Sequence, residues 1–147
     1  MVVYGEVHEM TDAVVENYRA NKFDALVCLG GGGTIKNALR LHEAGLNVLT
    51  LPKTIDNDVG DSAFKVIDHT PGYGSVARYW ALNIQNADQE NAGSSPSDPV
   101  LVLQAMGRKI GFIPAAARLA DPNREMPLLI FLRESGMGLS ELTDAVN

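Results

Sequence analysis

The chain has 147 residues, a length that suits one domain, and 46% of them are hydrophobic, which is enough to bury a sizeable core. The net charge is -6, and lysine and arginine do not gather into a basic patch, so we expect no nucleic-acid partner. No apolar run approaches the roughly 18 residues of a membrane helix, and residues 1–10 do not read as a secretory signal. The lone Cys28 cannot form an internal disulfide, so we expect a cytoplasmic protein without a membrane partner.

The spacing of apolar residues predicts strands and helices that alternate along the chain. Thr11 is expected to cap the first helix, and Gly45 to end the second. The expected helices cover residues 11–21, 34–44, 110–119 and 140–146, with another that begins at 71–74, and the expected strands cover residues 25–29, 46–51, 99–105 and 127–132. Continuous apolar strands that alternate with helices predict an α/β fold. We expect a Rossmann-like parallel sheet with helices on both faces, in a single domain over residues 1–147.

A run of glycines follows the first of these strands and opens a helix at Thr34. Consecutive glycines let the backbone approach a ligand closely, and free N–H groups at the start of a helix attract an anion. The candidate phosphate-binding residues are Gly31, Gly32, Gly33 and Thr34. The run is not a P-loop, because no Gly-Lys-Ser/Thr follows, and a dinucleotide fingerprint would need a glycine at Lys36. A tight turn without a ligand is the alternative.

The loop after the next strand, residues 52–58, carries an unusual density of polar groups. Either of its carboxylates, Asp56 or Asp58, could accept the proton of a sugar hydroxyl that attacks a phosphorus atom. Thr54 could hydrogen-bond a phosphate or the sugar, and Lys53 could neutralise phosphate charge. The alternative is a polar turn in which the acidic and amide side chains cap backbone groups.

A third loop, made of Met106, Gly107 and Arg108, follows the strand expected at residues 99–105. Arg108 suits a phosphate or a carboxylate, although an arginine after a strand is more often a solvated charge. Ligands of parallel sheets bind at the carboxyl ends of the strands, where the three loops would meet. We therefore expect a cleft with phosphate-binding backbone on one side and a carboxylate base on the other, as phosphoryl transfer requires. The spacing of His, Cys and carboxylates indicates no zinc site.

The motifs at residues 30–34, 52–58, 71–75 and 106–108, in this order, resemble the phosphofructokinase family, both its ATP- and its pyrophosphate-dependent members. The resemblance runs from about residue 23 through residue 132, and the Thr-Ile-Asp-Asn-Asp string at 54–58 is its most specific part. It implies phosphorylation of fructose 6-phosphate at the 1-hydroxyl, which gives fructose 1,6-bisphosphate in glycolysis. It also implies Mg²⁺ as a cofactor and a homo-oligomer in which sites are completed across subunits.

The resemblance further implies a role for each candidate residue. Asp56 matches the catalytic base toward the 1-hydroxyl, and Asp58 matches the residue that positions the sugar and assists in the transition state. Thr54 matches a contact with the sugar and the transferred phosphate. The sugar-phosphate pocket is implied for Met106, Gly107 and Arg108, and the donor-phosphate site for Gly31, Gly32, Gly33, Thr34 and Lys53.

The chain departs from the family pattern at several positions. Gly32 stands where the family usually has an aspartate that helps to hold magnesium. Gly33 favours ATP, because pyrophosphate enzymes commonly carry an aspartate there that excludes a nucleotide, whereas Lys53 is the residue that pyrophosphate enzymes carry. We expect ATP as the donor, with pyrophosphate as the alternative. Arg133 stands where a proline usually precedes Glu134.

Family members are more than twice as long as this chain, so we expect a fragment that is incomplete relative to the family fold and has little activity alone. The alternative function is a catalytically inactive module that binds phosphate or another subunit, which Gly32 favours. A nicotinamide-dependent oxidoreductase on a Rossmann-like sheet is disfavoured by the missing fingerprint glycine. NAD kinases and lipid kinases share a Gly-Gly-Asp-Gly loop but lack the string at residues 54–58.

Overall fold

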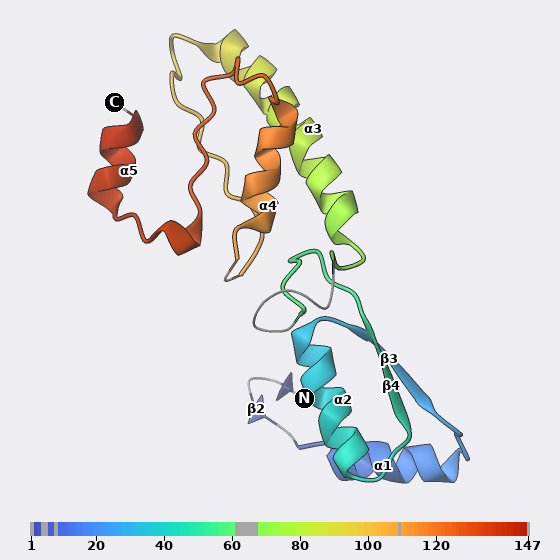
Figure 1. Ribbon diagram of the computed structural model, residues 1–147. Helices are drawn as coiled ribbons and strands as arrows, with labels where there is room; N and C mark the ends of the chain where they lie inside the picture. Colours follow the sequence, from blue (N-terminus) through green and yellow to red (C-terminus); the bar gives the residue numbers. More distant parts are fainter. Residues whose placement is uncertain (1, 4–5, 8, 61–67, 109, 147) are drawn as a thin grey trace. The chain divides into compact units, whose positions relative to one another are not determined.

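The computed structural model describes residues 2–3, 6–7, 9–60, 68–108 and 110–146. The contacts within the chain divide it into two compact units, Met1–Lys53 and Thr54–Asn147. Figure 1 draws the first unit in blue to blue-green and the second in green to red. The expected single domain over residues 1–147 therefore stays a prediction.

The first unit contains a parallel pair of strands joined by a helix. Strand β3 (Leu26–Gly30) pairs with β4 (Val48–Pro52) in the register Leu26↔Val48 through Gly30↔Pro52. Helix α2 (Gly32–Glu43) connects them and lies along the sheet (Figure 1). The order strand, helix, parallel strand is that of a βαβ unit, so the predicted α/β class is confirmed. A short antiparallel pair, β1 (Val2–Val3) and β2 (Glu6–Val7), precedes it.

Alternating side chains of the sheet differ in exposure, because α2 packs on the sheet and strand side chains point alternately to its two faces. Leu26 and Cys28 are half-buried, whereas Leu29 is 65% exposed. Leu49 and Leu51 of β4 are exposed as well. The sequence predicted helices on both faces of the sheet. Among the described residues of this unit, α2 packs against the sheet.

Helix α1 (Thr11–Ala20) forms where the sequence predicts it, but Thr11 is not its N-cap. The N-cap residue is Met10, and no side chain caps the helix from that position. The carboxylate of Glu9 accepts the Thr11 backbone N–H at 2.9 Å and the Thr11 hydroxyl as well. The pKa of Glu9 is lowered by these hydrogen bonds from Thr11. An acidic side chain thus supplies the acceptor that the sequence assigned to the threonine.

The second unit is built on the long helix α3 (Tyr73–Ser94). Helix α4 (Phe112–Ala115) and the 3₁₀ helix η1 (Ala116–Ala120) pack along it (Figure 1). Ile84, Ala117 and Ala120 form the core, and Trp80 packs against it. The 3₁₀ helix η2 (Arg133–Ser135) and helix α5 (Leu139–Val146) follow. None of the described helices is long and apolar enough to span a membrane.

The strands predicted at residues 99–105 and 127–132 are wrong, because the structure describes both segments as irregular chain. A strand needs a neighbouring strand to satisfy its backbone groups, and no strand pair is described in this unit. Val102 is 85% exposed. Leu128 and Ile130 instead pack against the core at α3, and Arg118 donates to the Leu128 carbonyl at 3.1 Å. Apolar content thus predicted burial for the second segment, but not its backbone pairing.

Candidate active site

A turn that follows β4 fixes Thr54 and Asp56 relative to each other. The Asp56 backbone N–H donates to the Thr54 hydroxyl oxygen at 3.2 Å. The Thr54 hydroxyl in turn donates to Asp56 Oδ2 at 3.3 Å. Thr54 is buried, whereas Asp56 is half-buried. Short polar side chains that bond to backbone two residues away are typical of such turns. The turn therefore presents the Asp56 carboxylate in a defined direction.

Thr70 locks this turn in place from the other side. Its side chain is fully buried, and its hydroxyl donates to the Thr54 carbonyl at 2.8 Å. Its backbone N–H donates to Asn57 Oδ1 at 2.8 Å, and Asn57 has a positive φ of 56°. Gly72 forms a parallel bridge with Thr54 at a φ of 106°, where an added Cβ would lie 3.2 Å from the Thr54 carbonyl oxygen. Only glycine fits that approach without strain.

Arg108 forms ion pairs with both acidic side chains of the loop. Its Nε lies 3.2 Å from Asp56 Oδ2, and its Nη2 lies 2.5 Å from Asp58 Oδ2. The Arg108 side chain is 58% exposed, whereas those of Asp56 and Asp58 are 17% and 15% exposed. The hydrogen bond to Asp58, together with both negative charges, raises the pKa of Arg108. Asp58 Oδ1 is buried and has no hydrogen-bond partner among the described residues.

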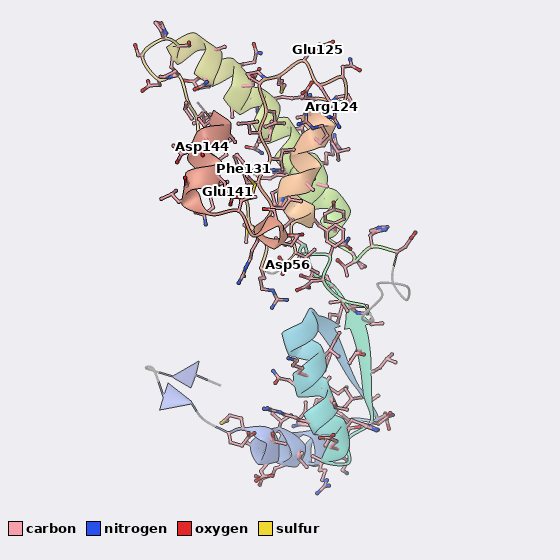
Figure 2. All side chains as sticks on the ribbon, turned by 60° about the vertical axis from the view of Figure 1, so that its left-hand side comes forward. Asp56, Arg124, Glu125, Phe131, Glu141 and Asp144 are labelled. Carbon is pink, nitrogen blue, oxygen red and sulfur yellow. The ribbon has the colours of Figure 1, made fainter. Side chains whose placement is uncertain are left out.

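Asp56 and Arg108 line an open cavity of about 460 Å³. Gly107, at a φ of 124°, turns the third loop so that it forms one wall. Figure 2 shows Asp56 at the lower end of the unit Thr54–Asn147 in that view. The lining residues are Ile55, Asp56, Gln104, Ala105, Met106, Gly107 and Arg108. The structure thus brings the predicted acceptor-site residues Thr54, Asp56, Asp58, Met106, Gly107 and Arg108 together in one unit.

The glycine loop and Lys53 belong to the first unit. Gly31 is the N-cap of α2, so Gly32, Gly33 and Thr34 form its first turn, where backbone N–H groups lack partners within the helix. A Cβ added at Gly32 or Gly33 would meet nothing within 4 Å. The exposed Lys53 donates its backbone N–H to the Gly30 carbonyl at 2.9 Å, which ties the residue after β4 to the end of β3. The cleft expected between the glycine loop and the acidic loop would join the two units and stays a prediction.

Several residues that shape the site were not predicted as site residues. Thr70 gave no signal beyond its place two residues before Gly72. Glu134 Oε1 accepts the Gly111 backbone N–H at 2.7 Å, and this hydrogen bond lowers the pKa of Glu134. Arg133 donates to the Arg108 carbonyl at 2.9 Å. The sequence marked Arg133 only as a departure from a family pattern, because a contact between residues so far apart in the chain leaves no local pattern.

Magnesium needs oxygen ligands, and it is commonly held by one or two carboxylates together with substrate phosphates. Among the described residues, no group of three or more His, Cys, Asp or Glu side chains could hold a metal ion. Asp56 and Asp58 both pair with a cation, Arg108. The described residues therefore do not form a magnesium site from protein groups alone.

Comparison with known proteins identifies a family for the chain. The family model described as Phosphofructokinase matches residues 4–147. An ATP-dependent 6-phosphofructokinase from Propionibacterium freudenreichii subsp. shermanii is 41% identical, over 82% of this chain and 30% of the relative. A sulfofructose kinase from Alkalicoccus urumqiensis is 32% identical, over 82% of this chain and 32% of the relative. A pyrophosphate–fructose 6-phosphate 1-phosphotransferase from Methylococcus capsulatus is 31% identical, over 84% of this chain and 30% of the relative.

The chain thus spans about 30% of the length of the curated relatives that it matches. Within that span the family model covers the glycine loop, the acidic loop and the loop of Arg108. The resemblance seen in these motifs is confirmed by a match over nearly the whole chain: this protein belongs to the phosphofructokinase family.

Proposed function

We propose that the protein transfers a phosphoryl group to the 1-hydroxyl of fructose 6-phosphate and so forms fructose 1,6-bisphosphate. The observation that carries this proposal is the pairing of Arg108 with Asp56 and Asp58, because Arg108 and Asp56 line an open cavity. A sugar hydroxyl needs a base, and a phosphate needs a cation. Both are present within one loop cluster, in a member of the phosphofructokinase family.

Asp56 is the proposed general base. As the hydroxyl oxygen forms its bond to the terminal phosphorus of the donor, the bond from that phosphorus to the leaving oxygen breaks. The hydroxyl proton passes to the Asp56 carboxylate, which lines the cavity and is fixed by its hydrogen bonds with Thr54. Asp58 positions the sugar, and Thr54 contacts the sugar and the transferred phosphate.

Arg108 serves the sugar-phosphate pocket together with Met106 and Gly107. Two adjacent carboxylates repel an anionic substrate, and the guanidinium of Arg108 offsets that charge at 2.5 Å and 3.2 Å. A guanidinium can also bind a phosphate through two parallel hydrogen bonds. Because its side chain is 58% exposed, Arg108 can reach a ligand in the cavity without unfolding its surroundings.

The donor is proposed to bind at the start of α2, through the backbone of Gly31, Gly32, Gly33 and Thr34 and through Lys53. Helix N-terminal N–H groups suit phosphate oxygens, and the open space beside Gly32 and Gly33 leaves room for them. ATP is the preferred donor in this proposal, with Mg²⁺ carried mainly by the donor phosphates. The relatives are named for ATP and for pyrophosphate, so both donors belong in the test.

A catalytically inactive phosphate-binding or subunit-interaction module is the second candidate. It is favoured by Gly32, which offers no carboxylate, and by Arg108, which occupies both acidic side chains in the unliganded chain. A homo-oligomer and a cytoplasmic location are proposed with the kinase function and rest on family membership alone.

The test measures phosphoryl transfer by the purified chain, with ATP–Mg²⁺ and pyrophosphate–Mg²⁺ run side by side on fructose 6-phosphate. Sulfofructose serves as a second acceptor, since one relative is named for it. Asp56→Asn keeps the size of the side chain and removes the base. Asp144→Asn on α5 makes the same change outside the site and is the matched control; Figure 2 labels both positions.

Turnover that falls about 10²- to 10⁴-fold in Asp56→Asn and is retained in Asp144→Asn would support the kinase function and name its donor. Binding of fructose 6-phosphate, followed by calorimetry, without turnover from either donor would favour the inactive module. The absence of both binding and turnover in the folded chain would contradict the kinase function and would leave only a subunit-interaction module.

A further inference from the structure

Two consecutive side chains of η2 hold both ends of the segment that carries Arg108. The Arg133 guanidinium donates through Nη1 to the Arg108 backbone carbonyl at 2.9 Å. The neighbouring Glu134 accepts the backbone N–H of Gly111 at 2.7 Å. One short turn thus binds a carbonyl at the start of the segment and an N–H at its end.

Gly111 permits this close approach. A Cβ at that position would lie 2.8 Å from Leu132 Cδ2 and 3.1 Å from each carboxylate oxygen of Glu134. Gly111 is itself buried. The backbone at Gly111 therefore packs directly on the turn, at a distance that a larger residue would prevent.

The Arg108 side chain has little packing of its own, because more than half of it is exposed. Its direction depends on two constraints, the ion pairs at its tip and the backbone from which it starts. The ion pairs alone leave several rotatable bonds between guanidinium and backbone. The backbone anchor is therefore the constraint that the rest of the fold supplies, and it comes from η2.

We propose that Arg133 is a positioning residue that holds the Arg108 backbone so that the Arg108 guanidinium faces both Asp56 and Asp58. A proline at this position could not make the contact, because it has no side-chain donor. Arg133 itself lies on neither carboxylate, so it acts through Arg108. The placement of Arg108 is a property of the structure, and its catalytic meaning rests on the proposed function.

The test follows the Arg108 Nε–Hε group by NMR in the ¹⁵N-labelled full chain, where ion pairing to Asp56 slows exchange of the Hε proton with solvent. Arg108→Lys removes the resonance and so assigns it. We expect Arg133→Ala to speed this exchange about threefold to tenfold, the range for loss of one net hydrogen bond. Arg133→Lys keeps a donor of shorter reach and is expected to restore part of the protection. Arg78→Ala on α3 removes one exposed arginine elsewhere in the unit and should change nothing.

A double-mutant comparison separates positioning from general loosening. In an Asp56→Asn background the Nε–Hε group has lost its charged partner, so adding Arg133→Ala should have much less effect on exchange than in the wild type. The resonances of α3 report whether the unit stays folded. Unchanged exchange in Arg133→Ala, or equal effects in both backgrounds, would overturn the proposal. The readout needs no turnover, so failure of the kinase proposal would appear separately.

Discussion

The two loops that follow the paired strands β3 and β4 are built in different ways. The glycine loop after β3 is made of backbone, and the Cβ positions of Gly32 and Gly33 face open space. The acidic loop after β4 is made of side chains, held by Thr70 and charged by Asp56 and Asp58. The first can offer N–H groups to an anion, and the second can accept a proton. In the proposed function, the donor phosphate therefore binds at the first loop and the reacting hydroxyl at the second.

Loss of Arg108 should have the largest of the expected effects, and it should weaken substrate binding at the acidic loop only. Arg108→Ala leaves Asp56 and Asp58 unpaired and removes the cation of the cavity. We expect affinity for fructose 6-phosphate, measured by calorimetry, to fall roughly tenfold to a hundredfold, the range for a charge-assisted hydrogen bond. Arg78→Ala is the control for a change in net charge. Unchanged affinity would place the sugar phosphate away from this loop.

A glycine substitution beside the acidic loop and one inside the glycine loop should have opposite effects on stability. Gly72→Ala forces a side chain into a φ of 106°, 3.2 Å from the Thr54 carbonyl oxygen, and should lower the free energy of unfolding by about 1–3 kcal/mol. Gly33→Ala, inside the first turn of α2 with open space around its Cβ, should raise it by up to about 0.5–1 kcal/mol. Urea unfolding checks both variants. Equal losses would show that the glycine loop is as tightly packed as the acidic one.

The Thr70 hydroxyl should account for part of the rigidity of the acidic loop. Thr70→Val keeps the shape of the side chain but leaves the buried Thr54 carbonyl without its donor, which costs about 1–3 kcal/mol. Thr143→Val on the exposed face of α5 removes a comparable hydroxyl bond to the Leu139 carbonyl, with an expected effect within about 0.5 kcal/mol. Similar unfolding free energies for the two variants would show that the Thr70 hydroxyl does not stabilise the acidic loop.

Acidification should weaken the hydrogen bond that Glu134 accepts from the Gly111 backbone N–H. This is the smallest of the expected effects. The hydrogen bond from Gly111 lowers the pKa of Glu134, so its contribution is present above the ordinary pKa of a glutamate and is lost as pH falls through the lowered value. We expect the amide of Gly111 to exchange faster below that pH. In Glu134→Gln an amide oxygen still accepts the bond but does not titrate. An identical pH profile in wild type and Glu134→Gln would show that other carboxyl groups cause the change.

The sequence predicted the parts of the site that lie close together in the chain. The residue types at 54–58 and at 106–108 indicated binding and catalytic chemistry, and the structure brings the two segments together through the ion pairs of Arg108. The contacts of Thr70, Arg133 and Glu134 join distant residues and have no local pattern. Apolar runs predicted β3 and β4 correctly, because each of these strands has a partner strand. The same pattern failed at residues 99–105, where the structure describes no strand.

The division of work between the loops can be tested by ligand-induced shifts of backbone amide resonances in the full chain. Fructose 6-phosphate should shift the amides of Thr54, Asp56 and Arg108, and pyrophosphate–Mg²⁺ should shift those of Gly32, Gly33 and Thr34. Two separate sets of shifted amides would support one loop for each substrate. A single set shifted by both ligands would contradict that division.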